Sequence, residues 1–144
     1  IINPIVCDFV EKFHVHDEQK HALFQLKVAR WQLDHKKYAS ALISSIEAMV
    51  THVCEENRKV GEVVFEKTEK VWEDYDFREL AKERMRKGHD GEIPLKCDKE
   101  LCRIFKKLNP YRNSIAHHLE QTENAQSIIN AISDNIIKLE RIIK

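Results

Sequence analysis

Apolar side chains recur at intervals of three and four residues along most of this chain, and that period is the period of an α-helix. The clearest run is Tyr38, Leu42, Ile46, Met49 and Val53. Only three Gly and three Pro occur among the 144 residues, which argues against an all-β domain rich in turns. The sequence therefore predicts an all-α fold. We expect a single domain over residues 1–144, because a chain of this length can bury a core without disulfides or a metal.

Helical spacing and end signals predict a bundle of about five or six helices. In the first half we expect one helix over 4–14, a second from 17 to about 35, and a core helix that begins at Tyr38. Within the core helix, Glu47 is a charged residue in an otherwise small and apolar neighbourhood. The pattern loosens over residues 58–75, where we expect a packed, partly helical connection.

In the second half, a D-x-x-E capping signal at Asp76 predicts a short helix that stops at Gly88. Residues 88–96 contain two Gly and one Pro, which favours a mobile surface loop. Asp98 is expected to cap a helix that ends at Pro110, where a further short helix begins. A cap at Thr122 then predicts a long closing helix.

The charge balance excludes a protein whose whole surface attracts nucleic acid or membrane. Lys plus Arg number 24 and Asp plus Glu number 24, so the formal net charge is zero. No apolar run approaches the roughly 18 residues of a membrane span, and the first residues lack the basic flank of a signal peptide. We therefore expect a cytoplasmic protein with no membrane partner.

Neither the cysteines nor the histidines indicate a metal site. Of four cysteines, the one close pair is Cys97 and Cys102, whose C-x4-C spacing differs from the C-x2-C of zinc and redox sites. His14, His16 and His21 do not share one helix face, since positions i and i+2 point to different sides. We expect reduced cysteines, no metal and no other cofactor.

One stretch departs from the neutral average. Residues 82–112 hold ten Lys or Arg against five Asp or Glu, a net charge of +5. Such a patch could neutralise a few phosphates, and Lys106 and Lys107 are its candidate RNA contacts. The alternative is an ordinary solvated helix face.

The basic stretch leads into Arg112, Asn113 and His117, residue types that suit phosphodiester chemistry. Imidazole can move a proton near neutral pH, and guanidinium matches the charge that grows on phosphate oxygens. On one helix, Asn113 and His117 share a face, whereas Arg112 and His117 lie about 140° apart. Two copies related by a two-fold axis could bring both pairs into one cleft. The Ile-rich closing helix fits such a dimer, although a core helix explains it nearly as well.

Spacing alone is weak, because the chain holds three R-x4-H matches. Those at Arg30 and Arg84 fall at predicted helix ends, where a cation is favourable. The third match, R-N-S-I-A-H at 112–117, resembles the RNxxxH form of the R-x4-6-H motif of the HEPN superfamily of helical ribonucleases. The helix that reads Y-A-S-A-L-I-S-S-I-E-A, the charged middle and the long closing helix look like HEPN domains of CRISPR-associated type III ancillary ribonucleases.

The resemblance implies a two-fold homodimer that cleaves single-stranded RNA without a metal, at a composite active site, in prokaryotic antiviral defence. By the motif, Arg112 would stabilise the transition state and His117 would move the proton between the ribose 2′-OH and the leaving 5′-oxygen. Asn113 would orient one of the two. His118 would be an accessory donor or an incidental neighbour, and Tyr111 would stack on a base or pack in the core.

The resemblance leaves four alternatives open. Such domains are often fused to a CARF sensor of cyclic oligoadenylates, and no Rossmann-like sensor is present here. The absence of an initial Met fits a longer chain that has lost this N-terminal sensor, and equally a HEPN toxin that pairs with an antitoxin. The same helices would also suit a non-catalytic module that binds RNA, a nucleotide or a protein partner, or a scaffold with an incidental motif.

Overall fold

A computed structural model describes residues 21–66, 69–88, 92–118 and 125–144, with the backbone alone for 113–118 and 125. Within these ranges there are six α-helices, one short 3-10 helix and no strand, which confirms the predicted all-α class. The elements are α2 (His21–Asp34), α3 (Tyr38–Glu56), α4 (Arg58–Val64), η1 (Val71–Glu73), α5 (Tyr75–Lys87), α6 (Lys99–His118) and α7 (Ala125–Ile142). The predicted helix over 4–14 and the cap at Thr122 lie outside the described residues.

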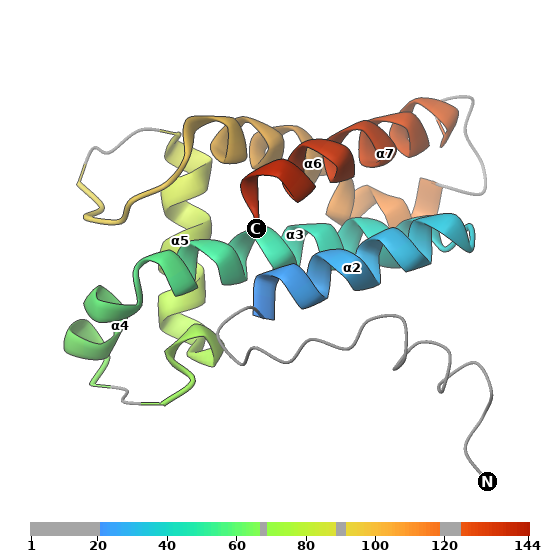
Figure 1. Cartoon of the computed structure of the whole chain (residues 1–144). Helices are drawn as coiled ribbons and strands as arrows, with labels where there is room; N and C mark the ends of the chain where they lie inside the picture. Colours follow the sequence, from blue (N-terminus) through green and yellow to red (C-terminus); the bar gives the residue numbers. More distant parts are fainter. Residues whose placement is uncertain (1–20, 67–68, 89–91, 119–124) are drawn as a thin grey trace, which may run out of the picture.

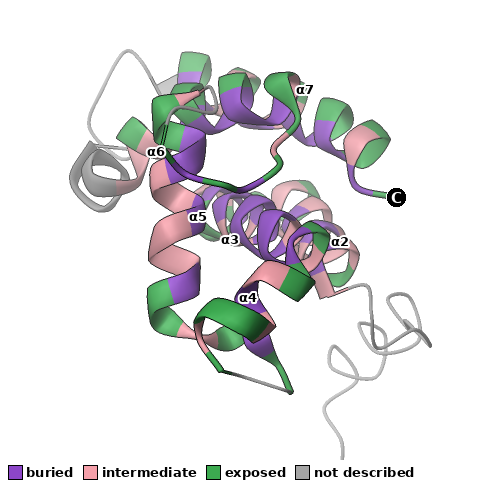
Figure 2. Ribbon diagram, turned by 90° about the vertical axis from the view of Figure 1, so that its left-hand side faces the viewer, coloured by how far each residue is buried: buried purple, intermediate pink, exposed green. Residues whose placement is uncertain are grey.

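Helix α3 is the centre of the bundle. It packs against α2, α5, α6 and α7. Helices α2 and α3 lie side by side in one layer, α6 and α7 form a second layer, and α5 crosses at one end (Figure 1). Buried residues follow the inward faces of these helices and most of α3 (Figure 2). The periodic run from Tyr38 thus forms the central core helix, as predicted.

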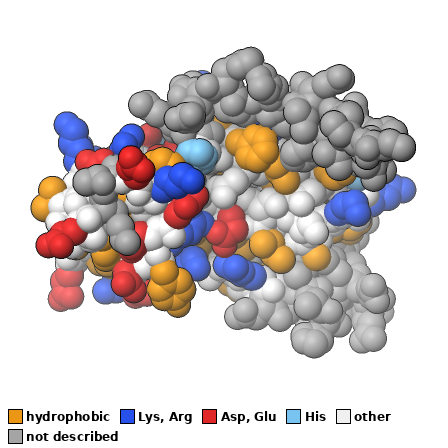
Figure 3. Space-filling model, turned by 90° about the horizontal axis from the view of Figure 1, so that it is seen from below, with side chains coloured by type: hydrophobic (Ala, Val, Ile, Leu, Met, Phe, Trp, Pro, Cys, Tyr) orange, Lys and Arg blue, Asp and Glu red, His pale blue; other side chains and the backbone are white. Residues whose placement is uncertain are grey.

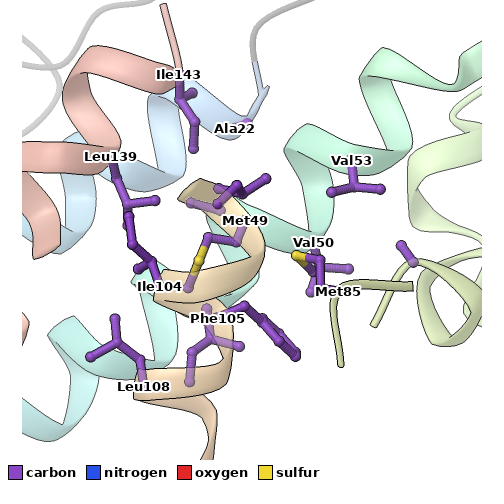
Figure 4. Packing of buried hydrophobic residues seen from close by; sticks show 14 of the residues in the cluster. Ala22, Met49, Val50, Val53, Met85, Ile104, Phe105, Leu108, Leu139 and Ile143 are labelled. Atoms are coloured by element: carbon purple, nitrogen blue, oxygen red, sulfur yellow. The ribbon is translucent and has the colours of Figure 1, made fainter. Parts of the chain in front are cut away.

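The core joins all of these helices (Figure 4). Met49 of α3 lies in the close-up between side chains of α6 and α7, and Met85 of α5 lies beside Val50. Truncating a buried side chain of this kind to Ala typically costs about 2 to 5 kcal/mol of folding free energy. The fully buried large side chains are Phe77, Phe105, Leu26, Leu42, Ile46, Met49, Met85, Leu101, Ile104, Leu108, Ile132 and Ile136.

The isoleucines of α7 belong mainly to this core. Ile128, Ile132, Ile136 and Leu139 are buried against the rest of the chain. Ile137 is the large apolar side chain of α7 that is exposed, at 42%. The core-helix explanation therefore accounts for the stripe, and the stripe itself gives no support to a dimer interface.

Helix α6 runs through Pro110 without a break, so the predicted division into two helices is wrong. Proline lacks an N–H and therefore removes one backbone hydrogen bond, to the carbonyl of Lys106. The inward stripe continues across this point, because Leu108 is buried and Tyr111 packs against the core. A break at Pro110 would take Tyr111 away from that core, and its packing offsets the cost of the proline.

The ends of α5 confirm one predicted signal and correct another. Gly88 ends the helix with a φ of 75°, a left-handed conformation that glycine adopts without a Cβ penalty. The N-cap is Asp74 rather than Asp76, since the side chain of Asp74 accepts a hydrogen bond from the backbone N–H of Phe77. Asp98 caps α6 as predicted, accepting from the N–H groups of Glu100 and Leu101.

The segment 58–75 is partly helical, as predicted, and Gly61 explains why its pattern is loose. A Cβ at Gly61 would lie 2.6 Å from side-chain carbons of both Phe77 and Val71. Helix α4 therefore approaches η1 and α5 more closely than a side chain at position 61 would permit.

The described part of the stretch before α6, residues 92–96, is a loop as predicted, and Glu92, Pro94 and Lys96 are exposed. Within its described part, Ile93 and Leu95 are buried. Arg84 of α5 is also buried, and its Nε donates to the carbonyl of Leu95 at 2.8 Å. Arg84 therefore ties this stretch to α5 and is more than the helix-end cation that the sequence suggested.

Candidate functional site

Helix α6 places Arg112 at the end of its buried face. Arg112 follows Leu108 by four residues and Phe105 by seven, so it continues the stripe that packs on α3. Its side chain is 36% exposed, and Nη2 lies 3.3 Å from Oε1 of Glu47 on α3. A guanidinium that the sequence selected for phosphate chemistry is therefore half-exposed and lies beside a carboxylate.

Glu47 also pairs with a second arginine. Its Oε2 accepts a short hydrogen bond from Nη2 of Arg78 on α5. Arg78 is fixed from its other side, because Nη1 donates to Oγ1 of Thr51 at 3.0 Å and to the carbonyl of Trp72 at 2.9 Å. We call Arg78, Glu47 and Arg112 the arginine relay. These three side chains together carry a net charge of +1, which favours binding of an anion.

Sequence reasoning found Arg112 but only part of its surroundings. The sequence marked Glu47 as a charged residue inside an apolar stripe, but it did not indicate which residues Glu47 pairs with. Arg78 carried no signal, because an arginine on the polar side of an amphipathic helix is ordinary. The contact joins residues 31 apart in sequence, and only the packing of α5 on α3 creates it.

The other motif residues are placed by the backbone alone. Asn113, His117 and His118 belong to α6, which is helical to His118, and their side chains lie outside the described residues. In this continuous helix, positions 113 and 117 are one turn apart, and positions 112 and 117 remain about 140° apart. Tyr111 is half-buried and packs against the core, the second of its two predicted roles.

Lys106 and Lys107 are exposed, but they do not lie beside Arg112. In the helix they are about 120° and 140° around the axis from position 112. The side chain of Lys106 lies over Gly88, where an added Cβ would be 2.0 Å from Nζ. Lys106 is thus close to the C-terminal end of α5, where a cation is favourable.

Three of the ten cations in the basic stretch are paired along their own helices. Lys82 pairs with Glu79, Arg86 with Glu83, and Arg103 with Glu100, all at i and i+3. The view from below shows acidic and basic side chains interspersed at the end of the molecule that carries α4 (Figure 3). For these paired cations, the solvated-face alternative describes the structure better than a phosphate-binding patch.

A second polar cluster lies at the C-terminal end of α3, around a cavity of about 440 Å³. Burial lowers the pKa of His52 in its wall, although Glu56 and Asp98 oppose that shift. Sγ of Cys97 lies 2.8 Å from Sγ of Cys102, and burial together with this contact raises the pKa of the Cys97 thiol. The cavity is lined by His52, Val53, Glu56, Lys96, Cys97, Asp98, Leu101 and Ile142.

The described part of the chain contains neither a metal-binding cluster nor a membrane-spanning helix. No three His, Cys, Asp or Glu side chains there are arranged to hold a metal ion. No helix there is both long and apolar enough to cross a bilayer. In comparisons with known proteins, no family model, no curated protein and no solved structure matches the chain.

Proposed function

We propose that this chain is a metal-independent endoribonuclease that cleaves single-stranded RNA. One observation carries the proposal. The arginine of R-N-S-I-A-H lies half-exposed at the end of the inward face of α6, where Nη2 is 3.3 Å from Oε1 of Glu47. An arginine that is oriented by a long contact with a carboxylate can still donate hydrogen bonds to phosphate oxygens. Among the described residues, Arg112 is the arginine of an R-x4-H match whose glutamate partner also binds a second arginine.

The proposed reaction uses the chain's own side chains. His117 removes the proton from a ribose 2′-OH, and the 2′-oxygen attacks the adjacent phosphorus. Arg112 stabilises the charge on the phosphorane-like transition state. The bond to the 5′-oxygen breaks, a proton from an imidazolium goes to that oxygen, and the products carry a 2′,3′-cyclic phosphate and a 5′-OH. DNA lacks the attacking hydroxyl and is not cleaved.

The helix geometry also supports a homodimer. Positions 112 and 117 lie about 140° apart on one continuous helix, so one copy presents them to different sides. A two-fold axis near α6 would place the arginine of one copy opposite the histidine of the other. We therefore expect activity to depend on protein concentration around the dimer dissociation constant.

The test is cleavage of labelled single-stranded RNA in EDTA, followed by end-group analysis, with a sample shown to be dimeric by light scattering. We expect His117→Ala and Arg112→Ala to lower the cleavage rate by at least about a hundredfold. His35→Ala is the matched control. His35 completes the R-x4-H match at Arg30, and it stacks on Trp31 with ring centroids 4.1 Å apart. Equal rates for the wild type, His117→Ala and His35→Ala would contradict the proposal.

The second candidate function is a binding module without turnover, and the arginine relay favours it equally. Two guanidinium groups around one carboxylate can bind a phosphate without a proton-transfer group. In that case Arg112→Ala weakens RNA binding, His117→Ala does not, and no cyclic phosphate forms with any variant. Fluorescence anisotropy with the same RNA separates the two functions.

A further inference from the structure

The two arginines of the relay share Glu47 unequally. Arg78 makes a short hydrogen bond to Oε2, whereas Arg112 lies 3.3 Å from Oε1. The Arg78 side chain is 17% exposed and the Arg112 side chain is 36% exposed. Glu47 is therefore principally the partner of Arg78, and Arg112 is the secondary partner that faces solvent.

Arg78 is also the better anchored arginine. Its Nη1 donates to Oγ1 of Thr51 and to the carbonyl of Trp72, so its guanidinium is held by α3, by η1 and by Glu47 at once. Thr51 is buried, and it lies one helical turn beyond Glu47 on α3. The position of the Glu47 carboxylate is thus determined by Arg78.

This division of the carboxylate affects Arg112. Arginine and carboxylate bind most strongly as a two-point fork, which requires both carboxylate oxygens. Since Arg78 already donates to Oε2, it competes with Arg112 for a two-point pair, and the contact of Arg112 with Glu47 is the longer one, 3.3 Å to Oε1. That contact is sufficient to orient the guanidinium, and it is weak enough to be exchanged for an RNA phosphate.

We propose that Arg78 is a positioning residue for RNA cleavage, which acts by occupying one oxygen of Glu47 and so keeps Arg112 available to phosphate. This inference rests on the proposed ribonuclease function. Without Arg78, Glu47 turns to Arg112 and pairs with it at two points. RNA must then displace a stronger partner before Arg112 can act.

The test is a pair of substitutions with opposite effects. Arg78→Met should lower kcat/KM for RNA cleavage by about tenfold, mainly through a higher KM, because Arg112 is sequestered in the free enzyme. Adding Glu47→Gln to Arg78→Met should restore kcat/KM to within about threefold of the wild type, since the amide no longer competes for Arg112. If Arg78 and Glu47 only stabilised the fold, the double variant would have a kcat/KM no higher than that of Arg78→Met.

The matched control is Arg30→Met. Arg30 joins α2 to α7 through Glu140, with Nη2 2.6 Å from Oε1, and is likewise an interhelical arginine and glutamate pair. We expect kcat/KM for Arg30→Met to stay within about twofold of the wild type. A loss equal to that of Arg78→Met would show that any broken interhelical pair has this effect, and would overturn the relay.

A measurement on the unmodified chain covers the case in which Arg78→Met does not fold. We expect the Nε–Hε NMR signal of Arg112 to shift on addition of a 2′-O-methyl RNA, which binds but cannot be cleaved, while the signal of Arg78 stays in place. Equal shifts of both signals would overturn the division of roles.

The same signals separate failure of this inference from failure of the proposed function. Arg78→Met should slow the exchange of Arg112 Nε–Hε with water, and adding Glu47→Gln should reverse it. If these changes occur without RNA cleavage by any variant, the relay stands and the ribonuclease function is wrong. If RNA is cleaved and Arg112 exchange does not respond, the relay is wrong and the function stands.

Discussion

Asn57 and Lys96, 39 residues apart in sequence, are joined by a pair of reciprocal hydrogen bonds. Oδ1 of Asn57 accepts from the backbone N–H of Lys96 at 2.8 Å, and Nδ2 donates to the Lys96 carbonyl at 2.9 Å. Nδ2 also donates to the carbonyl of Val53 at 2.8 Å, and the Asn57 residue is 5% exposed. One amide side chain therefore fastens the stretch before α6 to the end of α3.

We expect Asn57→Ala to lower the free energy of unfolding by about 2 kcal/mol. The truncation removes three hydrogen bonds and leaves part-buried backbone groups of Lys96 without this partner. Urea denaturation followed by circular dichroism measures the loss. Asn130→Ala on the exposed face of α7 is the control, for which a change within about 0.5 kcal/mol is expected. Equal stabilities for the two variants would show that the Asn57 bonds are not needed.

Gly61→Ala should destabilise the chain by about 1 to 3 kcal/mol, even though Ala favours a helix. Alanine gains about 1 kcal/mol in helix propensity over glycine. The added Cβ, however, would lie 2.6 Å from carbons of both Phe77 and Val71, and overpacking of a core outweighs that gain. Thermal unfolding would measure the change.

The control for this steric argument is Val63→Ala in the same helix. Val63 is 78% exposed, so its truncation should change the stability by less than about 0.5 kcal/mol. A Gly61→Ala variant more stable than the wild type would show that propensity decides at position 61.

Sequence periodicity predicted the helices well because each buries a stripe against the same core. It failed at Pro110, where the sequence predicted a helix end. The helix continues there, and Tyr111 packs against the core. It also placed the cap of α5 two residues late, because Asp74 and Asp76 both offer a capping side chain. Local sequence rules cannot choose between two neighbouring carboxylates that could each cap the helix.

For the site, the sequence selected Arg112 through its motif and marked Glu47 as an unusual charge. Arg78 could not be found, because its role depends on where α5 crosses α3. The same limit applies to Arg84, whose burial under the stretch before α6 depends on the path of that stretch. Motifs identify residues that meet a ligand, whereas residues that support them are defined by tertiary contacts.

Cys54 should resist alkylation in the folded chain. The residue is fully buried, and burial raises the pKa of its thiol to about 12, so very little of the reactive thiolate is present at neutral pH. We expect iodoacetamide at pH 8 to label Cys54 more than a hundredfold slower in buffer than in urea, measured on the Cys54 peptide by mass spectrometry. Similar rates in both solvents would contradict the burial of this thiol.

His52 should make the chain less stable as the pH falls below about 6.5. Burial lowers the pKa of folded His52 from its ordinary value of 6.5, and the nearby Glu56 and Asp98 only partly oppose this. Between the two pKa values the unfolded chain binds more protons than the folded chain, so the contribution is present above 6.5 and lost as the pH falls toward the folded pKa. Urea unfolding between about pH 7.5 and pH 5 should therefore show a steeper loss of stability for the wild type than for His52→Gln. Equal slopes for the two proteins would mean that His52 takes up its proton as readily in the folded chain as in the unfolded one.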